Sequence, residues 1–433
     1  MIVARSGMGQ GMDARADMLM PVAPGERIVA MDAVRAFALL GILLMNIEGM
    51  VGPLFGSITG VNPALTGANR VADTLIYIFV QGKFYTLFSL LFGMGFAVMM
   101  ARAEVAGRSF TALYLRRTFA LLAIGLLHLL LLWSGDILVN YSLMALVLLA
   151  VFRATSVHRL PWWGVALYLA PATIMALGGA MGSLAQLDPT AAADMAKGLA
   201  EQERAMADAL AAQRATYGGT DYLTAMARRW DDFTMFIGYL PVMGAHILGM
   251  FLLGAWFVRS GAIQRPQDFP RLYAGLRWVA LPVGLAAMLL AWWRVPTVDF
   301  GRMDLESGMA SVLTAIANLL MCLGYLAWLL RGLNGGGLAA RALAWIAPAG
   351  RMALTNYLTQ SLVCTTIFAG YGLGYFEQLP RAGQVPFALA LFALQVVASR
   401  AWLARFRHGP VEWGWRALTY GRLPAMRVVP GTP

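Results

Sequence analysis

The sequence predicts an all-α, polytopic transmembrane helix bundle of about ten spans with both termini in the cytoplasm. Of its 433 residues, 59% are hydrophobic and only 13% charged, whereas soluble domains are near half apolar and a quarter charged. The apolar residues gather in long runs that are separated by short basic segments. This pattern is typical of a multi-pass protein whose main partner is the lipid bilayer.

The apolar runs give the number of spans. A span needs about 20 mostly apolar residues, because each helical residue adds about 1.5 Å across a hydrocarbon core of about 30 Å. Ten runs approach this length, near 33–53, 76–101, 117–134, 137–152, 161–183, 235–258, 278–294, 308–330, 353–371 and 384–404. Ser134-Gly135-Asp136 separates the third run from the fourth and predicts a tight hairpin. Gln81-Gly82-Lys83 interrupts the second, so the alternative there is a short interfacial helix followed by a span from near Phe84.

The basic residues predict the orientation. With the amino end inside, 21 of them fall in inner segments and nine in outer segments, as the positive-inside rule requires. An even number of spans then places both termini in the cytoplasm. The predicted organisation is a cytoplasmic tail (1–31), five spans (32–183), an extracytoplasmic helical loop (184–232), five further spans (233–422) and a second cytoplasmic tail (423–433).

The long hydrophilic segment 184–232 is rich in Ala, Glu, Gln and Met, which favours helix. Asp188 or Thr190 can cap a helix whose first turn tolerates Pro189. The segment is interpreted as a helical excursion that lies over the bundle as a lid, or alternatively as a solvated connector.

Several functional classes are not supported by the sequence. The net charge of +11 comes from short basic clusters without an aromatic-basic motif, so no nucleic-acid partner is predicted. Cys322 and Cys364 lie in apolar runs, and neither a disulfide framework nor a metal site is expected. Walker, HExxH, GxSxG and GxGxxG motifs are absent, and no bound cofactor is predicted. The sequence is compatible with a homo-oligomer.

Polar residues inside apolar runs are the first candidates for a site, because an ionisable group in hydrocarbon is costly. Counting about 1.5 Å per residue from the nearest inner arginine places six of them in the outer half of the bilayer: Asn46, Glu48, Lys83, His128, Asp136 and His246. We predict that Glu48, His128 and Asp136 meet in one pocket. The alternatives are that Glu48, Lys83 and Asp136 extend to the outer interface, and that His246 only donates to a helix carbonyl.

Two segments near the carboxyl terminus carry a family resemblance. Residues 350–361 (GRMALTNYLTQS) and 409–421 (GPVEWGWRALTYG) resemble the YeiB-like bacterial membrane proteins, which contain a domain of unknown function. Residues 83–93 (KFYTLFSLLFG), 125–128 (GLLH) and 135–138 (GDIL) are also similar to that family. The resemblance covers most of residues 30–422 without the 184–232 loop. It implies a multi-pass protein of the bacterial inner (cytoplasmic) membrane.

YeiB-like proteins are in turn similar, more distantly, to integral-membrane acyltransferases, which move an acyl group from cytoplasmic acyl-CoA to an acceptor that is often a sugar. The link is Asp32-x-x-Arg35 at the start of the first span. In those enzymes a catalytic histidine follows the arginine by 11 residues, but here that position is Asn46. The resemblance therefore implies acyl transfer with acyl-CoA as co-substrate, and leaves His128 as the candidate base.

The function expected from these features is an acyltransferase-like activity on a small acceptor. His128 is the predicted general base, with Asp136 or Glu48 to orient it. Arg116 and Arg117, with other inner arginines, would hold the phosphates of acyl-CoA, or else serve only to set the topology. The predicted substrate-binding residues are Asp32, Arg35, Asn46, Lys83, His246, Arg351, Asn356 and Glu412. A transporter or lipid flippase that uses the same residues is the alternative, and a non-catalytic assembly or signalling protein is a third class.

Overall fold

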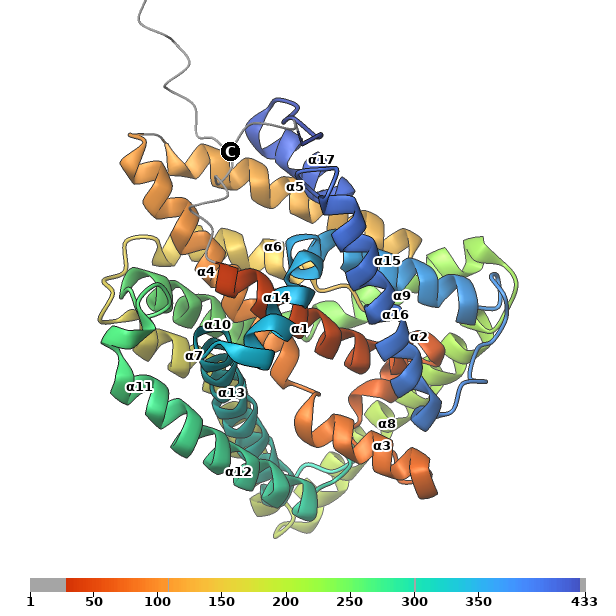
Figure 1. Ribbon diagram of the computed structural model, residues 1–433. Helices are drawn as coiled ribbons and strands as arrows, with labels where there is room; N and C mark the ends of the chain where they lie inside the picture. Colours follow the sequence, from red (N-terminus) through yellow and green to blue (C-terminus); the bar gives the residue numbers. More distant parts are fainter. Residues whose placement is uncertain (1–28, 108, 300, 429–433) are drawn as a thin grey trace, which may run out of the picture.

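A computed structural model of the chain describes residues 29–107, 109–299 and 301–428, and within these ranges the protein is helical with no strand (Figure 1). The α-helices are α1 (Val29–Asn46), α2 (Glu48–Val51), α3 (Gly67–Phe79), α4 (Lys83–Val105), α5 (Phe110–Leu131), α6 (Leu138–Val147), α7 (Leu160–Ala185), α8 (Pro189–Tyr217), α9 (Tyr222–Ile237), α10 (Leu240–Arg259), α11 (Pro270–Gly275), α12 (Leu281–Arg294), α13 (Leu305–Asn334), α14 (Gly337–Arg351), α15 (Ala353–Phe368), α16 (Arg381–Leu403) and α17 (Pro410–Tyr420). Short 3₁₀ or π segments are η2 (Leu54–Ile58), η3 (Leu148–Phe152), η4 (Pro266–Asp268) and η5 (Leu276–Ala280).

Seven helical stretches among the described residues are long and apolar enough to cross a membrane, which makes the chain a multi-pass membrane protein. They are Gly67–Val105, Phe110–Leu131, Leu160–Ala185, Leu240–Arg259, Pro270–Arg294, Leu305–Asn334 and Arg381–Leu403. The other three predicted spans correspond to shorter helices: α1 with 18 residues, α15 with 16, and α6 continued by η3. The predicted tail of residues 1–31 lies outside the described residues except for its last three.

The second predicted span is broken, as the sequence alternative proposed. α3 ends at Phe79, and α4 begins at Lys83 after Gly82, whose φ of +83° suits glycine and few other residues. A Cβ at Gly82 would also lie 2.2 Å from the Asn318 side chain. The break separates the short helix α3 from the longer helix α4.

Close helix packing in the core depends on glycine at two reciprocal positions. A Cβ at Gly93 of α4 would lie 2.1 Å from the Phe251 carbonyl oxygen, and one at Gly254 of α10 would lie 2.0 Å from that of Leu90. Small residues of this kind let two membrane helices approach at backbone distance. α7 and α13 pack around this pair, and α1 packs between α4 and α14.

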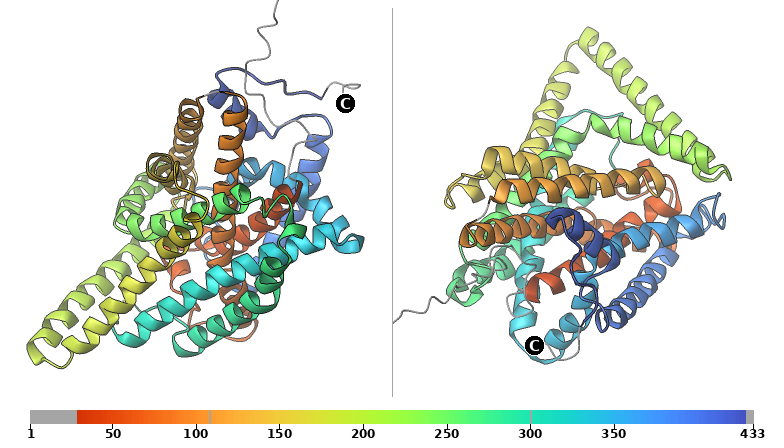
Figure 2. Two further views of the ribbon diagram at one scale, coloured as in Figure 1. Left: turned by 90° about the vertical axis from the view of Figure 1, so that its left-hand side faces the viewer. Right: turned by 90° about the horizontal axis from the view of Figure 1, so that it is seen from above.

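The hydrophilic segment forms α8 and α9, and α7 and α8 project together beyond the remaining helices (Figure 2). The Asp188 side chain accepts from the amides of Thr190 and Ala191 at 2.8 and 3.0 Å, so the predicted cap is confirmed. Pro189 occupies the first turn, where its missing N–H has no effect on the helix.

Arg229 fastens α9 to the bundle. Arg229 is only 1% exposed. Its guanidinium donates to the carbonyls of Leu130 and Leu131 at 3.0 and 3.4 Å and to the Tyr371 hydroxyl at 2.5 Å. These carbonyls belong to the last turn of α5, which has no intrahelical donors for them and favours a cation. α9 therefore supports the end of α5, and the solvated-connector alternative does not describe this part of the segment.

We expect reporter fusions to show the orientation that the charges predict. Fusions after Arg271 and Arg407 should report the cytoplasm, and a fusion near Gln202 in α8 should report the outer compartment. The reason is the excess of basic residues on the inner segments. Paired phosphatase and fluorescent reporters at each site measure this, and a cytoplasmic signal at Gln202 would contradict the orientation.

Candidate functional site

His128 lies near the carboxyl end of α5 and joins two other buried side chains. Its Nδ1 is 2.7 Å from Asp136 Oδ2, and its Nε2 is 2.8 Å from Ser361 Oγ on α15. Asp136 Oδ1 accepts from the Val139 amide at 2.9 Å. Since an ionised carboxylate only accepts, the hydrogen of the neutral imidazole belongs on Nδ1, and Nε2 is left to accept from the serine hydroxyl.

The α5–α6 hairpin explains why His128 and Asp136 meet. The turn predicted from Ser134-Gly135-Asp136 follows α5 directly, and α6 returns against it. Gly125 permits this return, because a Cβ there would lie 2.9 Å from the Val139 amide nitrogen. The contact between His128 and Asp136 thus arises from a short, local segment of the chain.

A cavity of about 210 Å³ lies beside this cluster. Tyr357 lines it, and the centroid of the Tyr357 ring is 5.1 Å from that of the His128 imidazole. The interior is mostly apolar, with Leu39, Ile42, Phe88, Leu91, Phe92 and Leu121 among its walls. At the other end, which we call the arginine end, Arg35, Arg117, Arg351 and Arg416 line the cavity. The cavity therefore connects a cationic end to the neighbourhood of a buried imidazole.

Neighbouring side chains hold the arginine end in place. Arg35 forms an i,i+3 ion pair with Asp32 at 2.8 Å. The Arg117 guanidinium lies 3.6 Å from the centroid of the Trp415 ring, and the indole N–H donates to the Arg117 carbonyl at 2.9 Å. This stacking joins α17 to α5 and aligns the guanidinium with the cavity wall.

Glu412 links the two carboxyl-terminal motifs. Its Oε1 accepts from the amides of Leu354 and Thr355 at 2.7 and 3.0 Å, and its Oε2 accepts from the Thr355 hydroxyl at 2.5 Å. These amides belong to the first turn of α15, where they lack intrahelical partners. Burial raises the pKa of this carboxyl group. Glu412, a predicted substrate-binding residue, lines the cavity, and its hydrogen bonds also hold the start of the helix that carries Ser361.

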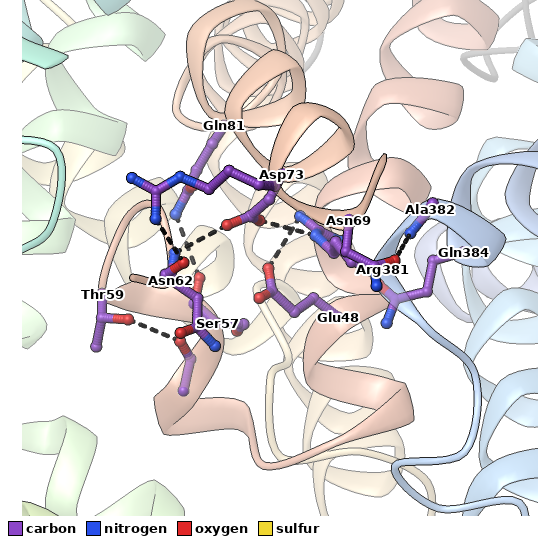
Figure 3. A network of polar contacts seen from close by, with 12 residues as sticks. Glu48, Ser57, Thr59, Asn62, Asn69, Asp73, Gln81, Arg381, Ala382 and Gln384 are labelled. Atoms are coloured by element: carbon purple, nitrogen blue, oxygen red, sulfur yellow. Dashed lines mark hydrogen bonds and ion pairs between the residues drawn. The ribbon is translucent and has the colours of Figure 1, made fainter. Parts of the chain in front are cut away.

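Glu48 lies in a different network from the His128 cluster. Its Oε2 is 3.0 Å from Arg381 Nη2, and the same guanidinium donates to Asp73 at 2.8 Å and to Gln384 at 2.8 Å (Figure 3). α2 directs the Glu48 carboxylate toward α3 and α16. Glu48 therefore does not orient His128, and Asp136 alone occupies that position.

Lys83 and His246 are satisfied by helix carbonyls. Lys83 Nζ donates to the Tyr77 carbonyl at 2.9 Å, at the end of α3. His246 Nδ1 lies 2.9 Å from the Val242 carbonyl of its own helix. Neither side chain lines the cavity at the arginine end or contacts His128. His246 matches its structural alternative, whereas Lys83 is fully buried and does not extend to an interface.

The two predicted asparagines differ in their surroundings. Asn356 Nδ2 donates to the Ala349 carbonyl and to Ser399 Oγ, both at 3.0 Å, which ties α15 to α14 and α16. Asn46 lies half-buried at the end of α1 and makes no side-chain hydrogen bond within the described part of the chain. Asn356 thus supports α15, the helix that carries Ser361, and its side-chain N–H groups already donate to these two acceptors.

Ser361 was not identified from the sequence. It lies within an ordinary helical segment and meets His128 across 233 residues of chain. The only available signal was its presence in the resemblance segment 350–361, where a serine hydroxyl does not stand out.

Comparison with known proteins shows the relationship that these segments suggested. A family model described as a protein of unknown function (DUF418) matches residues 257–422. The uncharacterized protein YxaH of Bacillus subtilis is 32% identical over 417 residues, which is 93% of this chain and 96% of YxaH. The uncharacterized protein YeiB of Escherichia coli is 32% identical over 406 residues, 91% of this chain and 96% of YeiB. The chain belongs to the YeiB-like family.

A further YeiB-like relative is an uncharacterized 39.9 kDa protein in the amylase 3′ region of Bacillus acidopullulyticus. It is 29% identical over 405 residues, which is 93% of this chain and 96% of that protein. No solved structure matches the chain. The predicted YeiB-like resemblance is confirmed, and both carboxyl-terminal motifs lie inside the matched region.

Proposed function

We propose that this protein is an acyltransferase of the inner membrane that moves an acyl group from cytoplasmic acyl-CoA to a small acceptor such as a sugar. The observation that supports this proposal is the cavity, which extends from the arginine end to the neighbourhood of His128, Asp136 and Ser361. Acyl-CoA has a matching order of groups, with phosphates at one end, a flexible arm, and the reactive thioester at the other. Arg117 precedes His128 by 11 residues on α5, or about 16 Å of helix, a length suited to that arm.

The arginine end supplies the chemistry for the phosphates. Guanidinium groups bind phosphate oxygens in pairs, with charge-assisted hydrogen bonds roughly twice as strong as neutral ones. The positive-inside rule assigns this end of the bundle to the cytoplasm, where acyl-CoA is found. The apolar interior excludes water from the thioester and so slows its unproductive hydrolysis.

His128 is the proposed general base. With hydrogen on Nδ1, its Nε2 can take the proton of a hydroxyl that attacks the thioester carbonyl, and the same proton can then go to the departing sulfur of coenzyme A. Asp136 holds the ring and stabilises the imidazolium that forms. The acyl group passes from sulfur to oxygen with no change in oxidation state.

Acyl-CoA binding by the purified protein tests the proposal. Arg117→Gln and Arg416→Gln should each weaken binding of octanoyl-CoA by about 10-fold or more, because a lost charge-assisted hydrogen bond is worth roughly 1.5–3 kcal/mol. Arg271→Gln, an exposed arginine of α11 away from the cavity, is the matched control. Titration calorimetry in detergent or nanodiscs gives the affinities, and equal losses in all three variants would contradict a phosphate site.

Release of free coenzyme A separates this proposal from a transporter or flippase. An acyltransferase should hydrolyse acyl-CoA slowly when no acceptor is present, whereas a transporter should leave the thioester intact. A thiol reagent that detects free coenzyme A measures this directly.

A further inference from the structure

Ser361 differs in its hydrogen bonding from two other buried serines of the bundle. Ser142 and Ser89 each donate to the carbonyl one turn back in their own helix, both at 2.8 Å. This is the usual bond of a serine in an apolar helix, because it satisfies the hydroxyl locally. Ser361 is fully buried, yet its Oγ lies 2.8 Å from Nε2 of His128 on another helix. Its hydroxyl is thus directed at a base.

Ser361, His128 and Asp136 have the connectivity of a nucleophile, a base and a group that orients the base. The two distances, 2.8 Å and 2.7 Å, lie within the range of such constellations. The Val139 amide fixes Asp136 in turn, and Glu412 fixes the start of the helix that carries Ser361. We propose that Ser361 is an acyl-accepting nucleophile that carries the acyl group as a serine ester; this rests on the proposed function.

The proposed reaction has two balanced steps. First, His128 Nε2 takes the Ser361 hydroxyl proton while Oγ attacks the thioester carbonyl carbon; the C–S bond then breaks and coenzyme A leaves with the proton. Second, Nε2 takes the proton of an acceptor hydroxyl, whose oxygen attacks the ester carbon. The bond from that carbon to Oγ breaks, and Ser361 regains the proton. His128 acts as base and then as acid in both steps.

Tyr357 is a neighbour of both the cavity and the His128 ring. It lines the cavity, and its ring is tilted by 50° to the His128 imidazole with the centroids 5.1 Å apart. It precedes Ser361 by one turn of α15, about 6 Å along the axis. Ser361 is fully buried and does not line the cavity, so the proposal requires a movement, with Tyr357 as the side chain nearest to both, that lets the thioester reach Oγ.

Acylation of the full-length protein tests the inference. The wild type is incubated with acetyl-CoA or octanoyl-CoA without acceptor, then digested and analysed by mass spectrometry. The peptide that contains Ser361 should gain the mass of the acyl group, and coenzyme A should appear in a burst of about one equivalent per protein. Ser361→Ala and His128→Gln should lose both the label and the burst, whereas Ser142→Ala, a buried serine outside the cluster, should keep them.

Ser361→Cys is the control for a folding defect in the alanine variant, because cysteine supplies a nucleophile of similar size to serine. It should carry the acyl group as a thioester that neutral hydroxylamine removes. If Ser361→Ala releases coenzyme A as fast as the wild type, transfer is direct and the serine ester is excluded while the proposed function stands. If the wild type neither binds nor cleaves either acyl-CoA, the proposed function and the serine ester are both excluded.

Discussion

Replacing His128 with glutamine is expected to lower the rate of coenzyme A release and acyl transfer by about 10²–10⁴-fold, the usual contribution of a general base. Glutamine keeps a polar side chain between Asp136 and Ser361, so the variant removes basicity while the buried groups retain a partner. The rates are measured on purified protein at saturating acyl-CoA, and the unfolding temperature is recorded to show that the variant is folded.

His246→Gln is the matched control, because it replaces the same residue type in another apolar helix. Its Nδ1 lies 2.9 Å from the Val242 carbonyl oxygen, its ring forms a T-shaped pair with Tyr168, and it lies outside the cavity. Activity should stay within about threefold of the wild type, in line with the small effects of most substitutions away from a site. Retention of most activity by His128→Gln, or an equal loss in both variants, would remove His128 from the mechanism.

The features that the sequence predicted correctly are local ones. The break between α3 and α4 followed from Gln81-Gly82-Lys83, and the α8 cap followed from Asp188-Pro189. The contact between His128 and Asp136 also belongs here, because a three-residue turn brings the chain straight back. In each case residues a few positions apart determine the backbone path, so a linear pattern contains the information.

The features that could not be predicted from the sequence depend on the direction in which a side chain points around its helix axis. Counting residues predicts a depth for Glu48 and His128, but depth does not tell which neighbour a side chain faces. α2 turns Glu48 toward Arg381, and α15 turns Ser361 toward His128. α15 also ends at Phe368, three residues before the end of the predicted run 353–371, whereas α6 with η3 matches the predicted run 137–152 to within one residue.

The ion pair between Glu48 and Arg381 leads to a prediction about the stability of the protein. The Arg381 side chain is 4% exposed and bridges Glu48 on α2 with Asp73 on α3, where Asp73 is 2% exposed. Arg381→Met should lower the free energy of unfolding by about 3–5 kcal/mol, since it leaves buried carboxylates without their cation. Urea or thermal unfolding in a fixed detergent measures the change. Arg294→Met is the comparison, because it breaks an exposed pair with Glu306 and should change stability by at most about 1 kcal/mol.

A combined variant separates the loss of the ion pair from the loss of packing. In Arg381→Met with Asp73→Asn and Glu48→Gln, the isolated negative charges are gone, so much of the lost stability should return. The Asp73→Asn side chain can still accept from the Asn62 amide, which donates to Asp73 at 2.9 Å in the native protein. If the combined variant is no more stable than Arg381→Met alone, the network acts through its shape and hydrogen bonds rather than its charge. If Arg381→Met is as stable as Arg294→Met, the network does not hold α3 and α16 together.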